Sequence, residues 1–259
     1  MASIILPIYP GIVLKTGSRG VDVALIQTEL TGLGFSASVD GIYGAGTKQA
    51  VITYQARRGL TPDGIVGKDT WDALINEYAQ RFPQNPVPYA GIVMRYGALG
   101  SCVKWFQKGQ NDFRSIYTAQ PQLTQDGIFG SNSTMAVRVF QRQFGLSIDG
   151  QMGKNTWNKF SEVLMAQSVS NLMKVTPTYP GSSLQQGSSG DTVRCIQSYV
   201  GQVKKAHNLN YPMPVVDGQF GSITKEAVMG FQATYGLQID GIVGPDTWQR
   251  LASEFNLIL

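Results

Sequence analysis

The residues that could carry out chemistry in this sequence are regularly spaced aspartates, five glutamates, two cysteines and a single histidine, His207. Paired carboxylates suit glycoside hydrolysis, a Cys–His pair suits nucleophilic catalysis, and clustered His and Cys ligands hold zinc. One histidine is too few for a catalytic zinc site with several His ligands. The sequence therefore predicts no metal and no cofactor.

The two cysteines are poorly placed for a nucleophile pair with His207. Cys195 lies 12 residues before His207 on the same predicted helix, which is about 18 Å at 1.5 Å per residue. Cys102 belongs to a different part of the chain. We expect each cysteine to fill a small buried helical position rather than to form a disulfide. We expect His207 to be exposed in a loop or at a helix end.

The glutamates are predicted to lie on helices at exposed positions, and none has an uncommitted acidic partner in the sequence. They are Glu29, Glu77, Glu162, Glu226 and Glu254. Hydrolysis by carboxylates alone therefore stays an alternative without a specific pair of residues to carry it.

The aspartates belong to a pattern that occurs three times. In each copy two Asp-Gly pairs lie 23 residues apart, and a Trp follows the second Asp by 8 residues. The pairs and their tryptophans are Asp40-Gly41, Asp63-Gly64 and Trp71; Asp126-Gly127, Asp149-Gly150 and Trp157; Asp217-Gly218, Asp240-Gly241 and Trp248. A calcium loop would place several acids at alternate positions, whereas each turn here offers one. These aspartates are therefore expected to bond backbone amides in turns, and the repeat predicts three small modules.

The elements that position these turns are helices. Val23, Ile26 and Leu30 have helical spacing and predict a helix over about 19–31, with Ser18 as its N-cap. A second helix is expected from near Thr47, and a third contains the Trp. The predicted fold is all-α, with three tandem three-helix modules joined by linkers that contain Pro and Gly. The predicted modules span residues 1–82, 83–172 and 173–259.

The copies differ in length before the first Asp-Gly turn. From Gln27, Gln107 or Gln197 to that turn there are 13, 19 and 20 residues in copies one, two and three. We expect a longer first helix and a polar, Pro-containing loop in the two longer copies.

The order Asp-Gly-Ile-x-Gly, Thr-x-x-Ala-Val-x-x-Phe-Gln, Gly-Leu and Asp-Gly-Ile-Val-Gly-x-x-Thr-Trp resembles the peptidoglycan-binding domain family. Copy three matches best, through Thr224, Ala227-Val228, Phe231-Gln232, Gly236-Leu237, Asp240-Gly241-Ile242-Val243-Gly244 and Thr247-Trp248. Copy one has Tyr54 in place of Phe, and copy two departs most, with Ser133 and Met152 at positions usually held by Thr and Val. The resemblance covers almost the whole chain.

This resemblance implies a small all-α fold that docks on bacterial cell wall and is usually attached to an amidase, peptidase or other lytic domain. The resulting hypothesis is non-catalytic binding of peptidoglycan, or a related wall polymer, by three modules that attach together. The protein is accordingly predicted not to be an enzyme. Two alternatives stay open: a structural or targeting component of a phage, tail-like or spore assembly, with other proteins as partners, and the carboxylate-only wall hydrolase.

Wall ligands are gripped by aromatic faces and by polar groups in shallow grooves. The candidates are the aromatic residue of each first turn, arginines able to meet carboxylates or phosphates, and an aromatic that occurs in copy two alone. These ligand-binding candidates are Tyr43, Arg57, Trp105, Phe129, Arg142 and Phe220. The turn aromatics have a competing interpretation as core residues. Trp105 is either an exposed binding residue or part of a contact between modules.

The net charge and the hydropathy of the chain further limit the classes of partner that it is expected to bind. The net charge of +4 and the pI near 9.0 suit work near anionic polymers, but no run of five Lys or Arg supports nucleic-acid binding. No segment is apolar enough to span a membrane, and the N-terminus lacks the features of a signal peptide. We expect synthesis in the cytoplasm without a signal peptide and action at the bacterial cell wall, whether extracellular, on a phage particle or associated with a spore.

Overall fold

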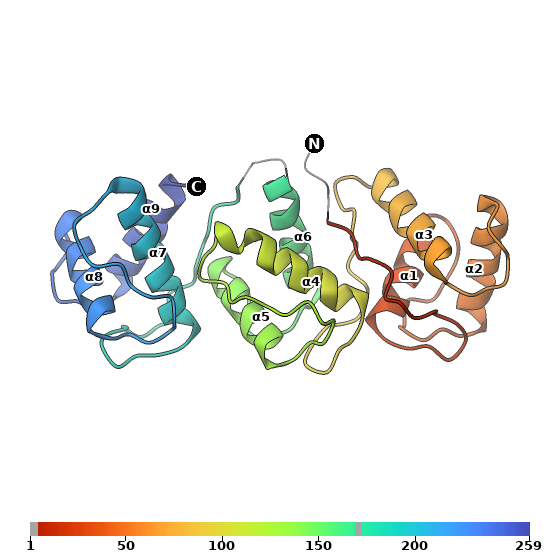
Figure 1. Cartoon of the computed structure of the whole chain (residues 1–259), viewed down its shortest axis with the longest axis horizontal. Helices are drawn as coiled ribbons and strands as arrows, with labels where there is room; N and C mark the ends of the chain where they lie inside the picture. Colours follow the sequence, from red (N-terminus) through yellow and green to blue (C-terminus); the bar gives the residue numbers. More distant parts are fainter. Residues whose placement is uncertain (1–4, 169–171) are drawn as a thin grey trace. The chain divides into compact units, whose positions relative to one another are not determined.

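The computed structural model describes residues 5–168 and 172–259, and within these ranges the backbone forms nine α-helices, one 3-10 helix and isolated β-bridges (Figure 1). The helices are α1 Val21–Gly32, α2 Ala45–Arg58, α3 Lys68–Arg81, α4 Ser101–Asp112, η1 Phe113–Ser115, α5 Ser131–Gln143, α6 Lys154–Ser168, α7 Asp191–His207, α8 Ser222–Thr234 and α9 Pro245–Leu257. Three helices fall in each copy of the repeat. The predicted all-α class with three tandem modules is confirmed.

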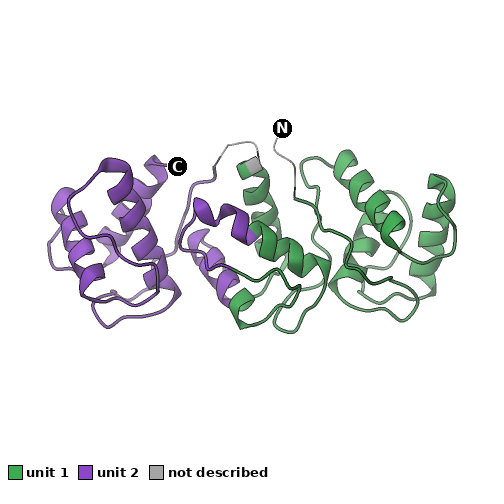
Figure 2. Ribbon diagram, viewed as in Figure 1, with its two compact units in different colours: residues 1–109, 123–134, 151–171 green, residues 110–122, 135–150, 172–259 purple. Residues whose placement is uncertain are grey.

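The chain folds into two compact units, coloured separately in Figure 2. Unit 1 comprises Met1–Gly109, Leu123–Thr134 and Gln151–Asn171, and unit 2 comprises Gln110–Gln122, Met135–Gly150 and Leu172–Leu259. The division runs through the second copy rather than between copies. The module boundaries inferred from the sequence therefore stay a prediction.

The helices form because their apolar residues recur at helical spacing. In α3, Trp71, Leu74, Ile75 and Tyr78 are all buried, as their spacing predicts. Burying one such side chain contributes about 1.5–3 kcal/mol relative to leaving it in water. Helix α1 differs, because nine of its twelve residues are buried. It is a central helix surrounded by protein rather than a helix with one apolar stripe.

Two local predictions are wrong. Helix α1 follows Gly20, which adopts φ of 120°, and no side chain caps it. The hydroxyl of Ser18 instead accepts a hydrogen bond from the Lys15 amide at 3.1 Å. The expected longer first helix is found only in copy three, where α7 has 17 residues. In copy two, α4 has 12 residues, the same length as α1, and the extra chain continues as η1.

The segment before each copy is tied to the tryptophan of that copy's third helix. The indole N–H of Trp71 donates to the Pro7 carbonyl at 3.1 Å, and Trp157 donates to Val87 at 3.1 Å. Trp248 donates to the carbonyl of Pro177 at 3.0 Å. All three indole rings are buried, as expected for large aromatic side chains in a small core. The lead-in segments are therefore ordered parts of the modules.

Candidate ligand-binding site

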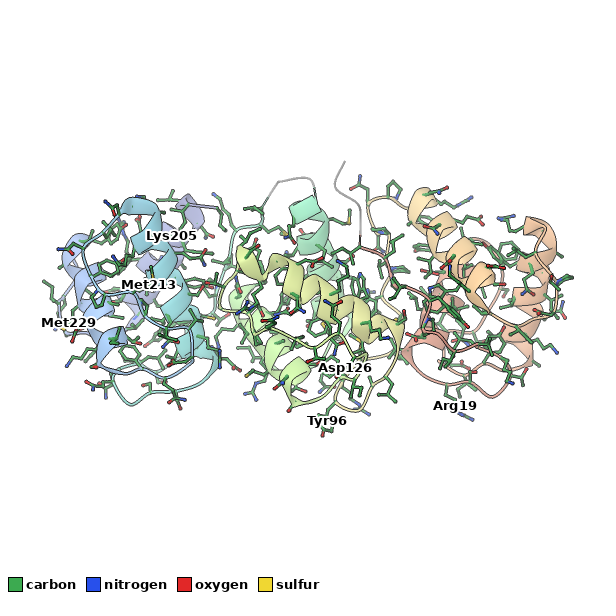
Figure 3. All side chains as sticks on the ribbon, in the orientation of Figure 1. Arg19, Tyr96, Asp126, Lys205, Met213 and Met229 are labelled. Carbon is green, nitrogen blue, oxygen red and sulfur yellow. The ribbon has the colours of Figure 1, made fainter. Side chains whose placement is uncertain are left out.

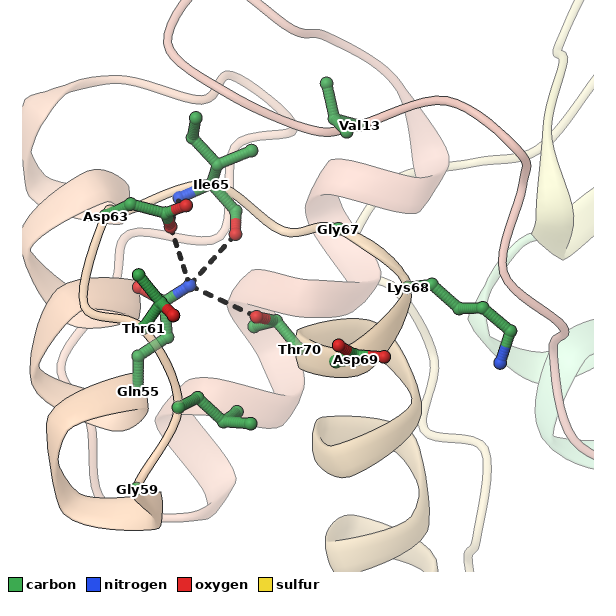
Figure 4. Close-up of a pocket in the computed structure, with 11 residues that line it drawn as sticks. Val13, Gln55, Gly59, Thr61, Asp63, Ile65, Gly67, Lys68, Asp69 and Thr70 are labelled. Carbon is green, nitrogen blue, oxygen red and sulfur yellow. Dashed lines mark hydrogen bonds between the residues drawn. The ribbon is translucent and has the colours of Figure 1, made fainter.

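Each Asp-Gly turn is held by a buried glutamine from the helix before it. In the second turn of copy one, Gln55 Oε1 accepts the Gly64 amide at 2.9 Å. Its Nε2 donates to Asp63 Oδ1 at 3.0 Å, to the Ile65 carbonyl at 2.9 Å and to Thr70 Oγ1 at 3.1 Å (Figure 4). Gln55 is 1% exposed, and its amide group is fully committed. We call this arrangement the glutamine clamp.

The same clamp occurs at all six Asp-Gly turns. The Gln–Asp pairs, with Nε2–Oδ1 distances of 2.7–3.0 Å, are Gln27–Asp40, Gln55–Asp63, Gln107–Asp126, Gln141–Asp149, Gln197–Asp217 and Gln232–Asp240. A Thr or Ser lies seven residues after every Asp, and in four turns its hydroxyl accepts from the same glutamine. Each copy therefore contains two successive units of helix, turn and helix, and the two units share the middle helix. The signal that could have revealed it was the Thr or Ser seven residues after every Asp, together with the Gln eight residues before the Asp of each second turn.

The turn carboxylates are committed to the backbone. Asp40 Oδ1 accepts the Ile42 amide at 2.8 Å in addition to the bond from Gln27. These hydrogen bonds, the backbone one first, lower the pKa of Asp40. The same causes lower the pKa of Asp126, Asp217 and Asp240. These bonds show that the aspartates hold the backbone of the turns, as expected. In the part of the chain that the structure describes, there is no group of three or more His, Cys, Asp or Glu that could hold a metal.

A polar hollow of about 530 Å³ opens beside the second turn of copy one (Figure 4). Its lining includes Val13, Thr61 and the first residues of α3, Lys68 and Asp69. Lys68 is bound to Asp72 at 2.5 Å, but its side chain is still 69% exposed. Figure 4 shows the Lys68 side chain pointing away from Gln55 and Thr70, so the hollow offers the hydroxyl of Thr61 and the carboxylate of Asp69 to a polar ligand. A shallow site of this kind can bind amide and hydroxyl groups of a polymer.

The aromatic residues of the first turns are core residues. Tyr43 and Phe129 are 0% exposed, and Phe220 is 2% exposed. The Tyr43 hydroxyl donates to the Gly64 carbonyl at 3.0 Å, which ties the first turn of the copy to the second. Because the rings are covered by protein, they present no face to a ligand. The structure thus selects their competing interpretation as core residues.

The other predicted site residues do not gather in one place. Trp105 is 2% exposed, its indole N–H donates to the Ile5 carbonyl at 3.0 Å, and its ring lies 4.9 Å from that of Trp157. It therefore belongs to a contact between copies. Arg57 is exposed, with its guanidinium 5.4 Å from the ring of Phe35. Arg142 is half-buried. Neither arginine lines the polar hollow.

The predictions for the cysteines and for His207 are confirmed, whereas the prediction for the glutamates is partly wrong. Cys102 and Cys195 are buried and free, as predicted, and burial raises the pKa of Cys195 to about 12. His207 ends α7 and is exposed, as predicted. The prediction that the glutamates are exposed is wrong for two of them. Glu254 is 5% exposed and pairs with Arg250 at 2.9 Å, whereas Glu29 is 0% exposed and neither carboxylate oxygen has a partner. Both fall on helix faces that pack inward.

The family model described as "Putative peptidoglycan binding domain" matches residues 19–74, 103–160 and 204–251, which together are more than half of the chain. The chain belongs to this peptidoglycan-binding domain family. Each of the three matched segments contains both Asp-Gly turns of one copy, and the third segment begins within α7.

Curated proteins of related sequence are named as enzymes. A probable N-acetylmuramoyl-L-alanine amidase of Bacillus licheniformis is 31% identical over 172 residues, which cover 60% of this chain and 46% of that protein. A spore cortex-lytic enzyme of Oceanobacillus iheyensis is 38% identical over 88 residues, which cover 33% of this chain and 32% of that protein. The chain spans less than half the length of these relatives. Among solved structures, the SleB N-terminal domain is 34% identical, with 27% of this chain and 96% of that chain covered and a TM-score of 0.26.

These names contradict the prediction that the protein is not an enzyme. Relatives at about 30% identity carry the names amidase and spore cortex-lytic enzyme, so membership of this family does not separate wall binding from wall cleavage. That prediction is withdrawn. Among the residues that the structure describes, no helix combines the length and apolar character needed to cross a membrane.

Proposed function

We propose that the chain attaches to bacterial peptidoglycan through its three copies, several of which engage the polymer at once. The observation that carries the proposal is the threefold match to one wall-binding family, with the same glutamine clamp in every copy. Weak binding by one copy gains strength when the next copy is held nearby, because the second binding event is then intramolecular. Repetition is thus a route to tight attachment without a deep pocket in any single copy.

The polar hollow beside the second turn of copy one is the candidate contact for this ligand. Thr61 and Asp69 place a hydroxyl and a carboxylate around a cavity, one side of which is fixed by the Gln55 clamp. Peptidoglycan offers amide, hydroxyl and carboxylate groups, each of which has a partner among these side chains. Because the clamp already holds this side of the cavity in place, less conformational entropy is lost when a ligand binds.

Sedimentation with purified sacculi tests the proposal. The chain is mixed with peptidoglycan from Gram-positive and from Gram-negative cells at several salt concentrations, and the protein in the pellet is quantified. Attachment predicts saturable recovery in the pellet with at least one type of sacculus. A protein that stays in the supernatant with both types under all salt conditions removes the proposal.

A second candidate is cleavage of the wall, which the names of the amidase and spore cortex-lytic relatives support. Release of dye from labelled peptidoglycan by the purified chain would support it. If a high protein concentration releases no dye while the chain still sediments with sacculi, cleavage by this chain is removed and attachment stands.

The proposed ligand, peptidoglycan, also indicates where the protein acts. We propose that the protein works at the bacterial cell wall, and the spore cortex-lytic relative supports a spore as one setting. Partner proteins of a wall-directed assembly are tested by co-purification from the source. If the chain is isolated without any such protein, the proposal that it belongs to a wall-directed assembly is wrong.

A further inference from the structure

A turn before the first helix has the same backbone in all three copies but different side chains in copy two. In copy two the Ala98 amide donates to the Arg95 carbonyl at 2.8 Å, and Gly97 adopts φ of 89°. In copies one and three, Ser18 donates to Lys15 at 2.8 Å and Ser188 donates to Gln185 at 2.9 Å. Their glycines adopt φ of 94° and 95°. The turn therefore keeps its glycine in every copy, whereas the residue before the glycine varies between Thr16, Tyr96 and Gln186.

Copy two places large apolar side chains on this turn and leaves them in solvent. Tyr96 is 73% exposed and Leu99 is 64% exposed, and Leu99 pairs in a β-bridge with Ile128, which is 52% exposed. Figure 3 shows Tyr96 pointing away from the ribbon. The corresponding residues are Thr16, Arg19 and Ile42 in copy one and Gln186, Ser189 and Gln219 in copy three. Polar residues hold the Tyr96 and Leu99 positions in both other copies, and Gln219 holds the Ile128 position in copy three, whereas copy one has Ile42 there. The fold therefore does not require these three apolar side chains together.

We propose that Tyr96, Leu99 and Ile128, here called the Tyr96 patch, form a surface on which copy two receives the sugar rings of a glycan strand. The inference rests on the proposed attachment to peptidoglycan and names a contact for it. An aromatic ring beside aliphatic side chains offers a flat apolar face, and polar groups at its edge give orientation. Tyr96 is the only one of the three equivalent turn residues that is aromatic.

The size and charge of the patch favour a glycan over a protein partner. A stable protein interface buries about 800 Å² and about 20–30 residues on each side, far more than three side chains on one turn provide. Two cations flank the patch: Arg95 is exposed, and the side chain of Lys104 lies against Gly127. These charges complement the acidic groups that peptidoglycan carries. Lys104 also interacts with Asp126 beside the patch, so the exposed Arg95 is the cation that best complements an acidic substituent on a sugar ring.

The test replaces the patch with the residues that copy three already uses. The variant Tyr96→Gln/Leu99→Ser/Ile128→Gln keeps a turn that copy three forms with these side chains, so its thermal unfolding should match the wild type. The control is Gln186→Ala/Ser189→Ala at the equivalent positions of copy three. Binding is measured by sedimentation with whole sacculi and with glycan strands from which the peptides have been removed.

We expect the patch variant to bind the stripped glycan about five- to tenfold more weakly than the wild type, and the control to bind as the wild type does. Equal binding by the patch variant and the wild type overturns the inference and leaves attachment in place. So does a wild type that binds whole sacculi but not stripped glycan. Loss of a wild-type dimer in the patch variant, seen by sedimentation velocity, would assign the patch to self-association instead. Failure of the wild type to bind sacculi removes both proposals.

Discussion

Unit 1 holds a charged contact between copies one and two, and unit 2 holds one between copies two and three, in addition to the hydrogen bonds of Thr118 with Ser198 and Gln202. The two charged contacts differ in kind. In unit 1 the carboxylate of Asp22 accepts the amides of Ser101 and Cys102, at 2.7 and 2.9 Å, and Asp22 is 7% exposed. In unit 2 the Nε of Arg138 lies 3.8 Å from Asp191 Oδ2, with side chains 53% and 21% exposed. The first contact is buried and reaches the backbone, whereas the second joins two partly exposed side chains.

The difference shows how one module fold can be joined to its neighbour with very different energies. The first amides of a helix have no partner within it, so a carboxylate that serves them acts as an N-cap supplied by another copy. Burial raises the pKa of Asp22 more than the two amides of α4 lower it, so the contact retains a desolvation cost. Exposed ion pairs contribute about 0–1 kcal/mol and weaken with salt. Stability should therefore depend more on the unit 1 contact.

The largest expected effect comes from Asp22→Ala. Two buried amides at the start of α4 lose their acceptor, and we expect the free energy of unfolding to fall by about 2 kcal/mol. Urea unfolding at neutral pH measures the change. Asp22→Asn is the matched variant, because its amide oxygen can still accept one of the two bonds and should give a smaller loss. A change below about 0.5 kcal/mol for Asp22→Ala would contradict the role given to this contact.

The next effect concerns Glu29 in unit 1, whose carboxyl is buried without a partner. Burial raises its pKa well above the usual 4.5, so the folded state holds a proton that the unfolded chain releases. This contribution to stability is present below pH 4.5 and is lost as the pH rises through the higher folded value. Glu29→Gln removes this dependence. At pH 8 the variant should unfold about 2–4 °C above the wild type, with little difference at pH 4; parallel Tm–pH curves for the two proteins would rule this out.

A third prediction sharpens the comparison because the glutamine clamps occur in both units. The lowered pKa values of Asp40, Asp126, Asp217 and Asp240 mean that their stabilisation is present above the ordinary aspartate value of 3.8. It is lost as the pH falls through the lower folded values. Tm should therefore drop below about pH 4 in Asp22→Ala as well as in the wild type. A Tm that stays constant from pH 5 to pH 2 would show that the clamps do not need ionised aspartates.

The smallest effect is expected for Asp191→Ala in unit 2. Its ion pair with Arg138 is long and partly exposed, so the loss should be below about 0.5 kcal/mol and should shrink further in 1 M salt. The same urea assay at low and high salt measures it. A loss as large as that of Asp22→Ala, unchanged by salt, would remove the distinction between the two contacts.

The repeat made most of the fold predictable. Gly and Asp at fixed spacing predicted the turns, and apolar spacing predicted the helices and the buried tryptophans, because turn geometry and helical period are local properties. The capping of α4 by Asp22 depends on a contact between two copies, from residues 79 apart in the sequence. The burial of Glu29 depends on the packing of other helices around α1. Such contacts leave no periodic signal in one sequence. Ser18 failed as an N-cap for a local reason, since Gly20 turns the backbone before α1 begins.

The candidate site was less predictable than the fold. The turn aromatics stood out because they repeat, yet a feature needed in every copy of a small core is needed for packing. The repeat pattern did not indicate Tyr96, because neither of the other copies has an aromatic residue at this position. In this chain, agreement between copies is the better signal for the fold, and we propose that exposed positions at which the copies differ are the better signal for function.

The central claim is attachment to peptidoglycan by several copies together, and one comparison of affinities tests it. The intact chain is titrated against whole sacculi and against soluble fragments that contain a single disaccharide-peptide unit. Multivalent attachment predicts a dissociation constant for sacculi at least about 100-fold lower than for the fragment. Equal affinity for both would mean that only one copy engages at a time, and no binding to either would mean that the chain does not attach to peptidoglycan.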